Sequence, residues 1–313
     1  MEAATTSAAT EAPPAKKKVT DRAKAERKLA WMLCAPAVIA MLIVTGYPIA
    51  YAFYLSLQRA DLRFPDDREF VGLTNYVDVL TSTTWWSDVV TTLIITVSSV
   101  AIELVLGMAI ALVMHRAIFG RGPVRATILI PYGIVTVVAA FAWKYAFDPT
   151  SGFVFGLPLV PDTWQPLNSK AGSLFVIIIA EVWKTTPFMA LLLLAGLALV
   201  PDELHEAAKV DGASTTQRFF RITLPLMRPA ILVALLFRTL DALRIFDLPF
   251  IVQPGGALGT ETLSILGYNV LINRVNLGLG SAVSILIFIF VILVAILFVK
   301  GLGTSTAQQR GET

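Results

Sequence analysis

Long uninterrupted blocks of apolar residues constrain this chain more than any other feature of its sequence. An α-helix needs about 20 apolar residues to cross the roughly 30 Å of hydrocarbon in a bilayer. Six blocks of that order are present, at residues 29–57, 89–114, 124–147, 173–200, 229–252 and 281–299. Of the 313 residues, 56% are hydrophobic and 15% are charged, whereas soluble domains average about 45–50% and 25%. The sequence therefore predicts an all-α integral membrane protein with six transmembrane helices.

The two ends of the chain differ from the blocks between them. Residues 1–28 are rich in Ala, Thr, Pro and Lys and show no apolar periodicity, which is typical of a disordered tail. Their last part could extend helically into the first span. The first apolar block is too long for a signal peptide and is expected to remain as an anchor. We expect a transmembrane domain over residues 29–303 and a second short tail over 304–313.

The distribution of Lys and Arg predicts the orientation of the spans. Positive residues close to span ends tend to stay on the cytoplasmic side. Sixteen of them lie in the N-terminal tail, around the turn at 115–125, in the loop at 201–228 and at the C-terminal end, against five in the opposite loops. Both termini are therefore predicted to be cytoplasmic. These residues form no basic stripe, so the net charge of +3 does not indicate nucleic acid binding.

Several kinds of site are not expected in this sequence. Cys34 is the only cysteine, so neither an intrachain disulfide nor a cysteine-based metal cluster can form. His115 and His205 are far apart in sequence, and we predict no metal site. No Gly-x-x-x-x-Gly-Lys-Ser/Thr segment occurs, so the chain cannot cradle ATP phosphates by that route. We predict no cofactor in this chain, and energy for any active process must come from another subunit.

The loop at 201–228 carries the most specific motif. Residues 206–213 read Glu-Ala-Ala-Lys-Val-Asp-Gly-Ala, and residues 219–226 read Phe-Phe-Arg-Ile-Thr-Leu-Pro-Leu. This resembles the EAA loop of bacterial ATP-binding-cassette (ABC) importer permeases, in which Glu-Ala-Ala is followed by a Gly and then by Ile-x-Leu-Pro. The variant with Asp-Gly-Ala is common among permeases of the carbohydrate group, of the maltose and trehalose type. The likeness extends over nearly the whole chain after the tail, and trehalose importer permeases of actinobacteria are especially similar.

Local chemistry explains how such a motif builds a docking surface. Asp202, after Pro201, can cap a short helix, and Gly212 can supply a left-handed turn that other residues resist. Ser214 and Gln217 have the spacing of a capping box, which starts a second helix expected to end before Pro225. Two short helices joined at a glycine form a compact knob. The alternative is an amphipathic hairpin that only lies along lipid headgroups.

The resemblance implies a fold, partners and residues for coupling. It implies the type I ABC importer permease fold in a bacterial plasma membrane. It also implies a second homologous permease in a heterodimer, nucleotide-binding ATPase subunits that hold ATP and magnesium, and an extracytoplasmic sugar-binding lipoprotein. In this family the loop is the coupling helix that fits a cleft on the ATPase. The coupling residues implied here are Glu206, Ala207, Ala208, Asp211 and Gly212.

Charged residues within the apolar blocks point to a polar path. They are Glu103, Lys144, Glu181, Lys184, Arg238, Asp241, Arg244 and Asp247. Charges are costly in hydrocarbon, so they line a water-filled path or pair with one another. The last four are spaced so that one continuous helix would carry them on a single face, which suits a carbohydrate and its many hydroxyl groups. The alternative is that these charges only pair and lock helix packing.

The resemblance also implies a sugar site. In maltose-type permeases the sugar contacts a Pro-Tyr-x-x-x-Ser/Thr stretch and a Trp-x-x-x-Pro-aromatic stretch, which occur here at 131–136 and 183–188. Pro187 is expected to break its helix. The sequence departs from the maltose pattern in the next span, at Arg238, Ala242 and Ile245. The predicted sugar-binding residues are Tyr132, Thr136, Trp183, Lys184, Thr185, Phe188, Arg238 and Asp241.

We therefore predict the permease subunit of an ABC importer that takes up a sugar, with a disaccharide such as trehalose favoured. Transport would follow alternating access driven by separate ATPase subunits, and the chain itself is not an enzyme. Two other hypotheses stay open on the sequence alone. One is an ion-coupled secondary transporter, for which no internal repeat is visible. The other is a membrane-bound enzyme using a carboxylate pair such as Asp241 and Glu181.

Overall fold

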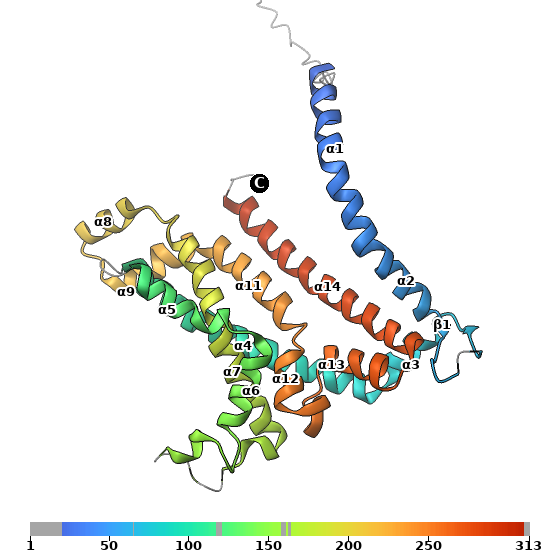
Figure 1. The fold of residues 1–313 in the computed structure, drawn as a ribbon. Helices are drawn as coiled ribbons and strands as arrows, with labels where there is room; N and C mark the ends of the chain where they lie inside the picture. The colour runs from blue at the N-terminus through green and yellow to red at the C-terminus, as the bar shows by residue number, and fades with distance from the viewer. Residues whose placement is uncertain (1–20, 65, 117–120, 158–160, 162–163, 310–313) are drawn as a thin grey trace, which may run out of the picture. The chain divides into compact units, whose positions relative to one another are not determined.

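A computed structural model describes residues 21–64, 66–116, 121–157, 161 and 164–309. The chain divides into two compact units, residues 1–51 and 52–313 (Figure 1). Within the described residues, four helices are long and apolar enough to cross a membrane. The number rises to six if each of two bent helix pairs counts as one span. The predicted all-α fold with six spans is consistent with this count.

The first unit is helical throughout its described part. It contains α1 (Asp21–Met41), the π-helical turn η1 (Leu42–Gly46) and the beginning of α2 (Tyr47–Ser56). Most of the large apolar side chains in this stretch are exposed, as expected of a segment that lipid would cover. Helix α1 begins at Asp21, so the end of the predicted tail is helical, whereas residues 1–20 lie outside the described part.

Two long helices form the centre of the second unit. Helices α4 (Thr83–Arg116) and α7 (Lys170–Leu197) pack along each other (Figure 1). Gly107 lies at their closest approach, where an added Cβ would be 2.8 Å from Cγ of Met189. Gly196 of α7 meets Ala230 of α11 (Arg228–Ala242) in the same way. Small residues thus let the backbones approach closely, as is common in membrane helix packing.

Two predicted spans are bent. The block at 124–147 forms α5 (Arg121–Gly133) and α6 (Thr136–Ala146), which meet at an angle of 90°. The bend arises because Pro131 and Gly133 weaken the end of α5 and residue 135 is extended, with ψ of 130°. A second bend of 66° separates residues 215–226 from 228–252.

The block at 229–252 is also interrupted. Helix α11 ends at Ala242, and α12 (Asp247–Val252) begins after a short break. Phe246 has φ −132° and ψ −65°, which is not helical, and Pro249 in the first turn favours a new start there. The expectation that four charges share one helix face is therefore wrong, since Arg244 and Asp247 lie beyond the end of α11.

Pro187 does not break its helix. Helix α7 continues through it from Lys170 to Leu197. The hydroxyl groups of Thr185 and Thr186 donate to the carbonyls of Glu181 and Val182, each at 2.6 Å. These bonds go to the two carbonyls that precede that of Trp183, which Pro187 leaves without its i+4 donor.

The remaining elements cover the ends of these helices. The short apolar helix from Leu263 to Asn273 was not predicted, because this stretch was expected to be a Gly-rich loop. Helix α14 continues through part of the expected C-terminal tail. The bounds are β1 (Gln58–Arg59) paired antiparallel with β2 (Glu69–Phe70), α3 (Thr74–Thr81), η2 (Phe153–Gly156), η3 (Pro166–Asn168), η5 (Pro254–Gly259), α13 (Leu263–Tyr268), η6 (Asn269–Asn273) and α14 (Leu277–Gln309).

Candidate functional site

A polar cavity of about 440 Å³ lies where α5, α6, α7, α11 and α12 meet. Five of the eight residues that the sequence predicts for sugar binding line it. Several of them lie next to the break between α5 and α6 or in and beside the break between α11 and α12. The lining residues are Tyr132, Thr136, Glu181, Lys184, Thr185, Asp241, Arg244, Ile245, Phe246, Asp247 and Leu248.

One wall of the cavity is aromatic. The rings of Tyr132 and Phe188 are stacked, with centroids 5.4 Å apart and an interplanar angle of 13°. The ammonium group of Lys184 lies 5.6 Å from the centroid of the Tyr132 ring, within the range of a cation–π interaction. Tyr132 is 45% exposed, whereas Phe188 is half-buried. A flat ring beside a fixed cation can receive the C–H face of a sugar while the ammonium donates to its hydroxyls.

Arg238 and its carboxylate partners form a network of charges beside the cavity. The fully buried Arg238 contacts Glu103 through Nε at 2.5 Å and Glu181 through Nη2 at 2.5 Å. Its Nη1 is 3.1 Å from Oδ2 of Asp241, whose side chain is 68% exposed. Oγ1 of Thr185 lies 2.7 Å from Oε1 of Glu103, so its single hydrogen has two acceptors within reach, this carboxylate and the Glu181 carbonyl. Arg238 thus joins three carboxylates from α4, α7 and α11, two of which also line the cavity.

The other predicted sugar residues lie outside the cavity wall. Trp183 packs edge-on against Trp143, with ring centroids 5.9 Å apart, and Phe188 reaches the cavity only through Tyr132. Arg238 is enclosed by its carboxylate partners, which matches the alternative that such charges pair and lock helix packing. The carboxylates of Glu181 and Asp241 both contact this arginine, so they do not form a free acid–base pair.

Some lining residues were not predicted. Glu181, Arg244 and Asp247 were recognised as charged but not as part of the site, and Ile245 was noted only as a departure from the maltose pattern. Phe246 and Leu248 were not considered. Glu103 was noted as a charge within a span, but nothing in the sequence pairs it with Arg238. The sequence signal for Arg244 and Asp247 is the cluster of polar residues around the break between α11 and α12.

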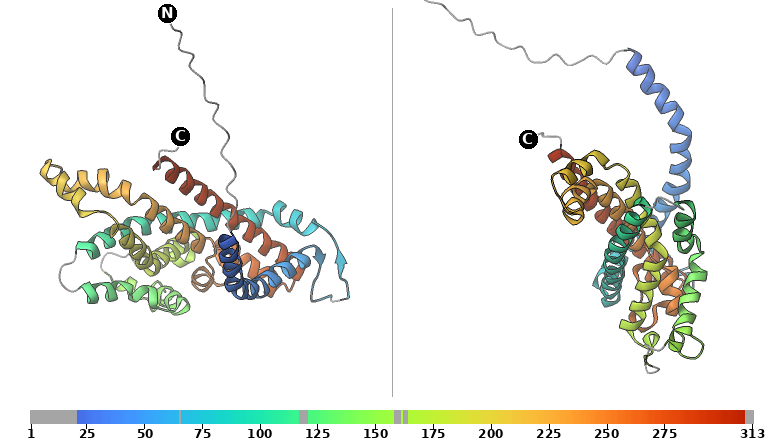
Figure 2. Two further views of the ribbon diagram at one scale, coloured as in Figure 1. Left: turned by 90° about the horizontal axis from the view of Figure 1, so that it is seen from above. Right: turned by 90° about the vertical axis from the view of Figure 1, so that its left-hand side faces the viewer.

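The coupling loop forms a separate, exposed region. It contains α8 (Asp202–Val210), α9 (Thr215–Arg218), the π-helical turn η4 (Phe219–Thr223) and α10 (Leu224–Leu226). Helix α8 projects at one end of the second unit (Figures 1 and 2). Gly212, between α8 and α9, has φ of +80°, a left-handed conformation that residues with a Cβ resist. The loop is therefore a knob of two short helices hinged at this glycine, as predicted.

The caps of the knob agree with the sequence in part. Ser214 accepts from the backbone N–H of Gln217 at 3.2 Å, and the Gln217 side chain accepts from the Ser214 N–H at 2.8 Å, which completes the predicted capping box. Asp202 is not a cap, because Pro201 takes that position and Asp202 is the first helical residue. The second helix also continues through Pro225 to Leu226, because proline is tolerated in the first turn of α10.

The predicted coupling residues lie at the tip of this knob. Glu206, Ala207, Asp211 and Gly212 are exposed, and Ala208 is half-buried. The two alanines and Gly212 keep this surface slim, and Glu206 and Asp211 place two carboxylates on it. No group of three or more His, Cys, Asp or Glu among the described residues could hold a metal ion.

Comparison with known proteins supplies the family. The sequence profile described as "Binding-protein-dependent transport system inner membrane component" matches residues 80–306. The chain belongs to this family. It is thus the permease component of an ABC importer and not its ATPase, and the hypotheses of an ion-coupled transporter and a membrane enzyme gain no support. The EAA motif and the coupling helix are typical of such permeases.

Relatives cover nearly the whole permease. It is 53% identical over 281 residues to the trehalose transport system permease protein SugA of Mycobacterium tuberculosis, covering 90% of this chain and 91% of the relative. It is 40% identical over 280 residues to the trehalose/maltose transport system permease protein MalF of Thermococcus litoralis, covering 88% and 94%. The predicted membership of the maltose and trehalose group is confirmed.

Solved structures share the fold of the permease. A chain of a bacterial alginate ABC transporter, in complex with an alginate pentasaccharide-bound periplasmic protein, superposes with a TM-score of 0.74. The match covers 94% of this chain and 99% of that one at 21% identity. The predicted type I importer permease fold is therefore confirmed.

Proposed function

We propose that this permease carries a neutral disaccharide, with trehalose favoured, across the plasma membrane by alternating access. The observation that carries this proposal is the cavity in which Tyr132, Lys184 and Asp241 come together from three helices. Donors, acceptors and an aromatic face converge there, which is the combination that an oriented carbohydrate requires. The identity of 53% to a trehalose permease supports the choice of sugar.

The charges around the cavity favour a neutral ligand. Lys184 and Arg244 bring positive charge to the wall, and Glu181, Asp241 and Asp247 bring negative charge. Arg238 pairs with Glu181 and Asp241, so neither sign dominates. A site for an acidic sugar would be expected to carry an excess of cations. Hydroxyl groups, in contrast, can donate to the carboxylates and accept from Lys184 and Arg244.

Other subunits complete the transporter in this proposal. A six-span permease with one coupling loop supplies half of a pathway, and a second, homologous permease supplies the other half. Separate ATPase subunits bind ATP and magnesium, and they receive Glu206, Asp211 and the alanines between them in a cleft. An extracytoplasmic binding protein delivers the sugar. Reversing a conformational equilibrium from 1:99 to 99:1 needs about 5.5 kcal/mol of differential binding, which ATP-driven closure can provide.

The test uses the purified complex in proteoliposomes. We expect labelled trehalose to enter only with ATP and the binding protein, and trehalose to stimulate ATP hydrolysis more than maltose or an acidic disaccharide does. Uptake without any ATPase subunit would exclude the proposal. Stimulation by an acidic sugar alone would exclude the neutral ligand.

The orientation has its own test. We propose that both termini and the coupling loop are cytoplasmic, on the basis of the Lys and Arg distribution. Because Cys34 is the only cysteine, a Cys34→Ser background allows one new thiol to be placed with Asp211→Cys. A membrane-impermeant maleimide is expected to label this thiol only from the cytoplasmic side. Labelling from outside intact cells would reverse the proposed topology.

A further inference from the structure

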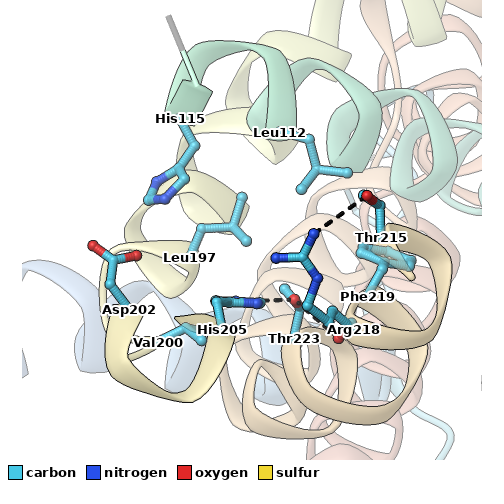
Figure 3. Close-up of a pocket in the computed structure, with 10 residues that line it drawn as sticks. All are labelled: Leu112, His115, Leu197, Val200, Asp202, His205, Thr215, Arg218, Phe219 and Thr223. Atoms are coloured by element: carbon cyan, nitrogen blue, oxygen red, sulfur yellow. Dashed lines mark hydrogen bonds between the residues drawn. The ribbon is translucent and has the colours of Figure 1, made fainter. Parts of the chain in front are cut away.

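A second cavity lies under the coupling loop. It has a volume of about 330 Å³ and is enclosed by the ends of α4 and α7 and by the short helices of the loop (Figure 3). From α4 and α7 it is lined by two leucines and His115, and several of the residues on the side of the loop are polar. They are Leu112, His115, Leu197, Val200, Asp202, His205, Thr215, Arg218, Phe219 and Thr223.

Part of the guanidinium group of Arg218 has no acceptor among the described residues. Its Nη2 donates to Oγ1 of Thr215 at 3.3 Å, but its Nε is buried and has no hydrogen-bond partner among the described residues. Figure 3 shows this side chain extending into the space between Leu112 and Thr223. A buried charged donor without a partner is costly, and an anionic oxygen is the acceptor that satisfies it best.

The chain's two histidines line the same cavity. His115 comes from the end of α4 and His205 from α8, and Nε2 of His205 is 3.5 Å from Oγ1 of Thr223 (Figure 3). Asp202 is the carboxylate among the lining residues. The cavity therefore offers a phosphate ester N–H donors from one guanidinium and two imidazoles, next to a single carboxylate.

An apolar groove adjoins this polar cavity. It has a volume of about 320 Å³ and shares Leu112, Thr215 and Phe219 with the first cavity, adding Val113 and Thr216. Val113 is 62% exposed and lies on α4, one of the helices that can cross the membrane. The groove therefore continues from the polar cavity onto the exposed side of a helix that is long and apolar enough to cross a membrane.

We infer that the two cavities together bind one anionic phospholipid. Its phosphate accepts from Arg218 and the histidines, and an acyl chain follows Val113 and Phe219. Basic pockets beside spans at the cytoplasmic surface are a recurrent setting for such headgroups. A free phosphate would satisfy Arg218 but leave the apolar groove empty, so the lipid accounts for more of the observed surface.

The bound lipid would brace the knob against the membrane. The cavity wall joins α8 and η4 of the loop to α4 and α7, whereas none of the five predicted ATPase-facing residues lines it. This inference rests on the proposed function only in placing the loop at the cytoplasmic bilayer surface, and it is independent of the sugar.

The test measures lipid retention directly. The permease is purified with its accompanying subunits from membranes containing phosphatidylglycerol, without sugar or nucleotide, and retained lipid is counted by native mass spectrometry. Arg218→Gln is compared with Arg221→Gln, since Arg221 is exposed and does not line the cavity. We expect Arg218→Gln to lose roughly tenfold in affinity for phosphatidylglycerol, because one charged hydrogen bond is lost. We expect no loss of affinity in Arg221→Gln. Val113→Ser leaves Arg218 intact and is expected to weaken retention as well, which keeps the test valid if Arg218→Gln does not fold.

Two outcomes would overturn the inference. Equal retention in wild type, Arg218→Gln and Val113→Ser would show that this surface binds no specific lipid. Loss of inorganic phosphate binding in Arg218→Gln, with phosphatidylglycerol retention unchanged, would assign the cavity to a free anion. A failure of sugar uptake would leave these measurements unaffected, so it is distinguishable from a failure of the lipid site.

Discussion

The buried charges around Arg238 and the exposed coupling loop are two polar regions of this permease that are built in opposite ways. Arg238 is joined to Glu103, 135 residues earlier in the chain, and to Glu181, 57 residues earlier. The contacts that shape the loop are local, since the capping box joins residues three apart. Two of the three carboxylates around Arg238 are almost fully buried, whereas no residue of α8 is buried.

This difference teaches which interactions tolerate change. A buried charge depends on every partner, because removing one leaves the others unpaired in a medium of low polarity. A local turn depends on backbone conformation, so only residues that cannot adopt the required φ disturb it.

The largest effect is expected from Arg238→Met. It leaves Glu103 and Glu181 without their cation, which should destabilise the fold by about 3–5 kcal/mol. The measurement is denaturant unfolding of the detergent-solubilised permease. Arg244→Met is the matched control, because Arg244 is exposed. Equal stability of the two variants would mean that the buried charge network contributes little to the stability of the fold.

The next effect is expected from Gly212→Val at the hinge of the coupling loop. A left-handed residue with a Cβ costs about 1–2 kcal/mol, and the space around Gly212 is open, with nothing within 4 Å of an added Cβ. We expect ATP hydrolysis to persist while sugar uptake falls, because the knob changes its angle. Gly212→Asn is the control, since Asn adopts this conformation more readily. If Gly212→Asn lost as much uptake as Gly212→Val, the cause would be the added side chain and not the left-handed backbone conformation.

A smaller effect is expected from Tyr132→Ala in the sugar cavity. The loss of one aromatic face should weaken sugar-dependent stimulation by about 1 kcal/mol, seen as a higher sugar concentration at half-maximal ATPase activity. Tyr145→Ala is the control, because Tyr145 stacks on Phe141 at 6.3 Å and does not line the cavity. A similar shift in both variants would contradict the proposed site.

The smallest effect is expected at the surface pair of Asp61 and Arg63. The side chain and the backbone N–H of Arg63 donate to Asp61 and lower the pKa of this carboxyl from 3.8 to about 2. Because the pKa is lowered in the folded state, the pair stabilises the fold above pH 3.8 and loses this effect as the pH falls toward 2. Asp61→Asn should therefore be slightly less stable than wild type at neutral pH, and the difference should shrink on acidification. A constant difference across this range would rule out the ion pair as its cause.

Much of the fold could be predicted from the sequence. The six apolar blocks coincide with helices or bent helix pairs, because the length of an apolar run determines what can cross a bilayer. The bends near residue 134 and at residues 243–246 were not predicted, since hydropathy does not register a change of direction. The short helix from Leu263 to Asn273 was missed because glycines around it resembled a loop.

The sequence by itself determined the membrane class, the family and the shape of the coupling loop. Each depends on residues close together in the chain, such as the capping box of Ser214 and Gln217 or the left-handed Gly212. Only the tertiary structure decided which charges meet, enclosing Arg238 with Glu103 and leaving Tyr132, Lys184 and Asp241 around one cavity. The physical reason is that helix propensity and capping act over a few residues, whereas the partner of a buried charge is set by how distant helices pack.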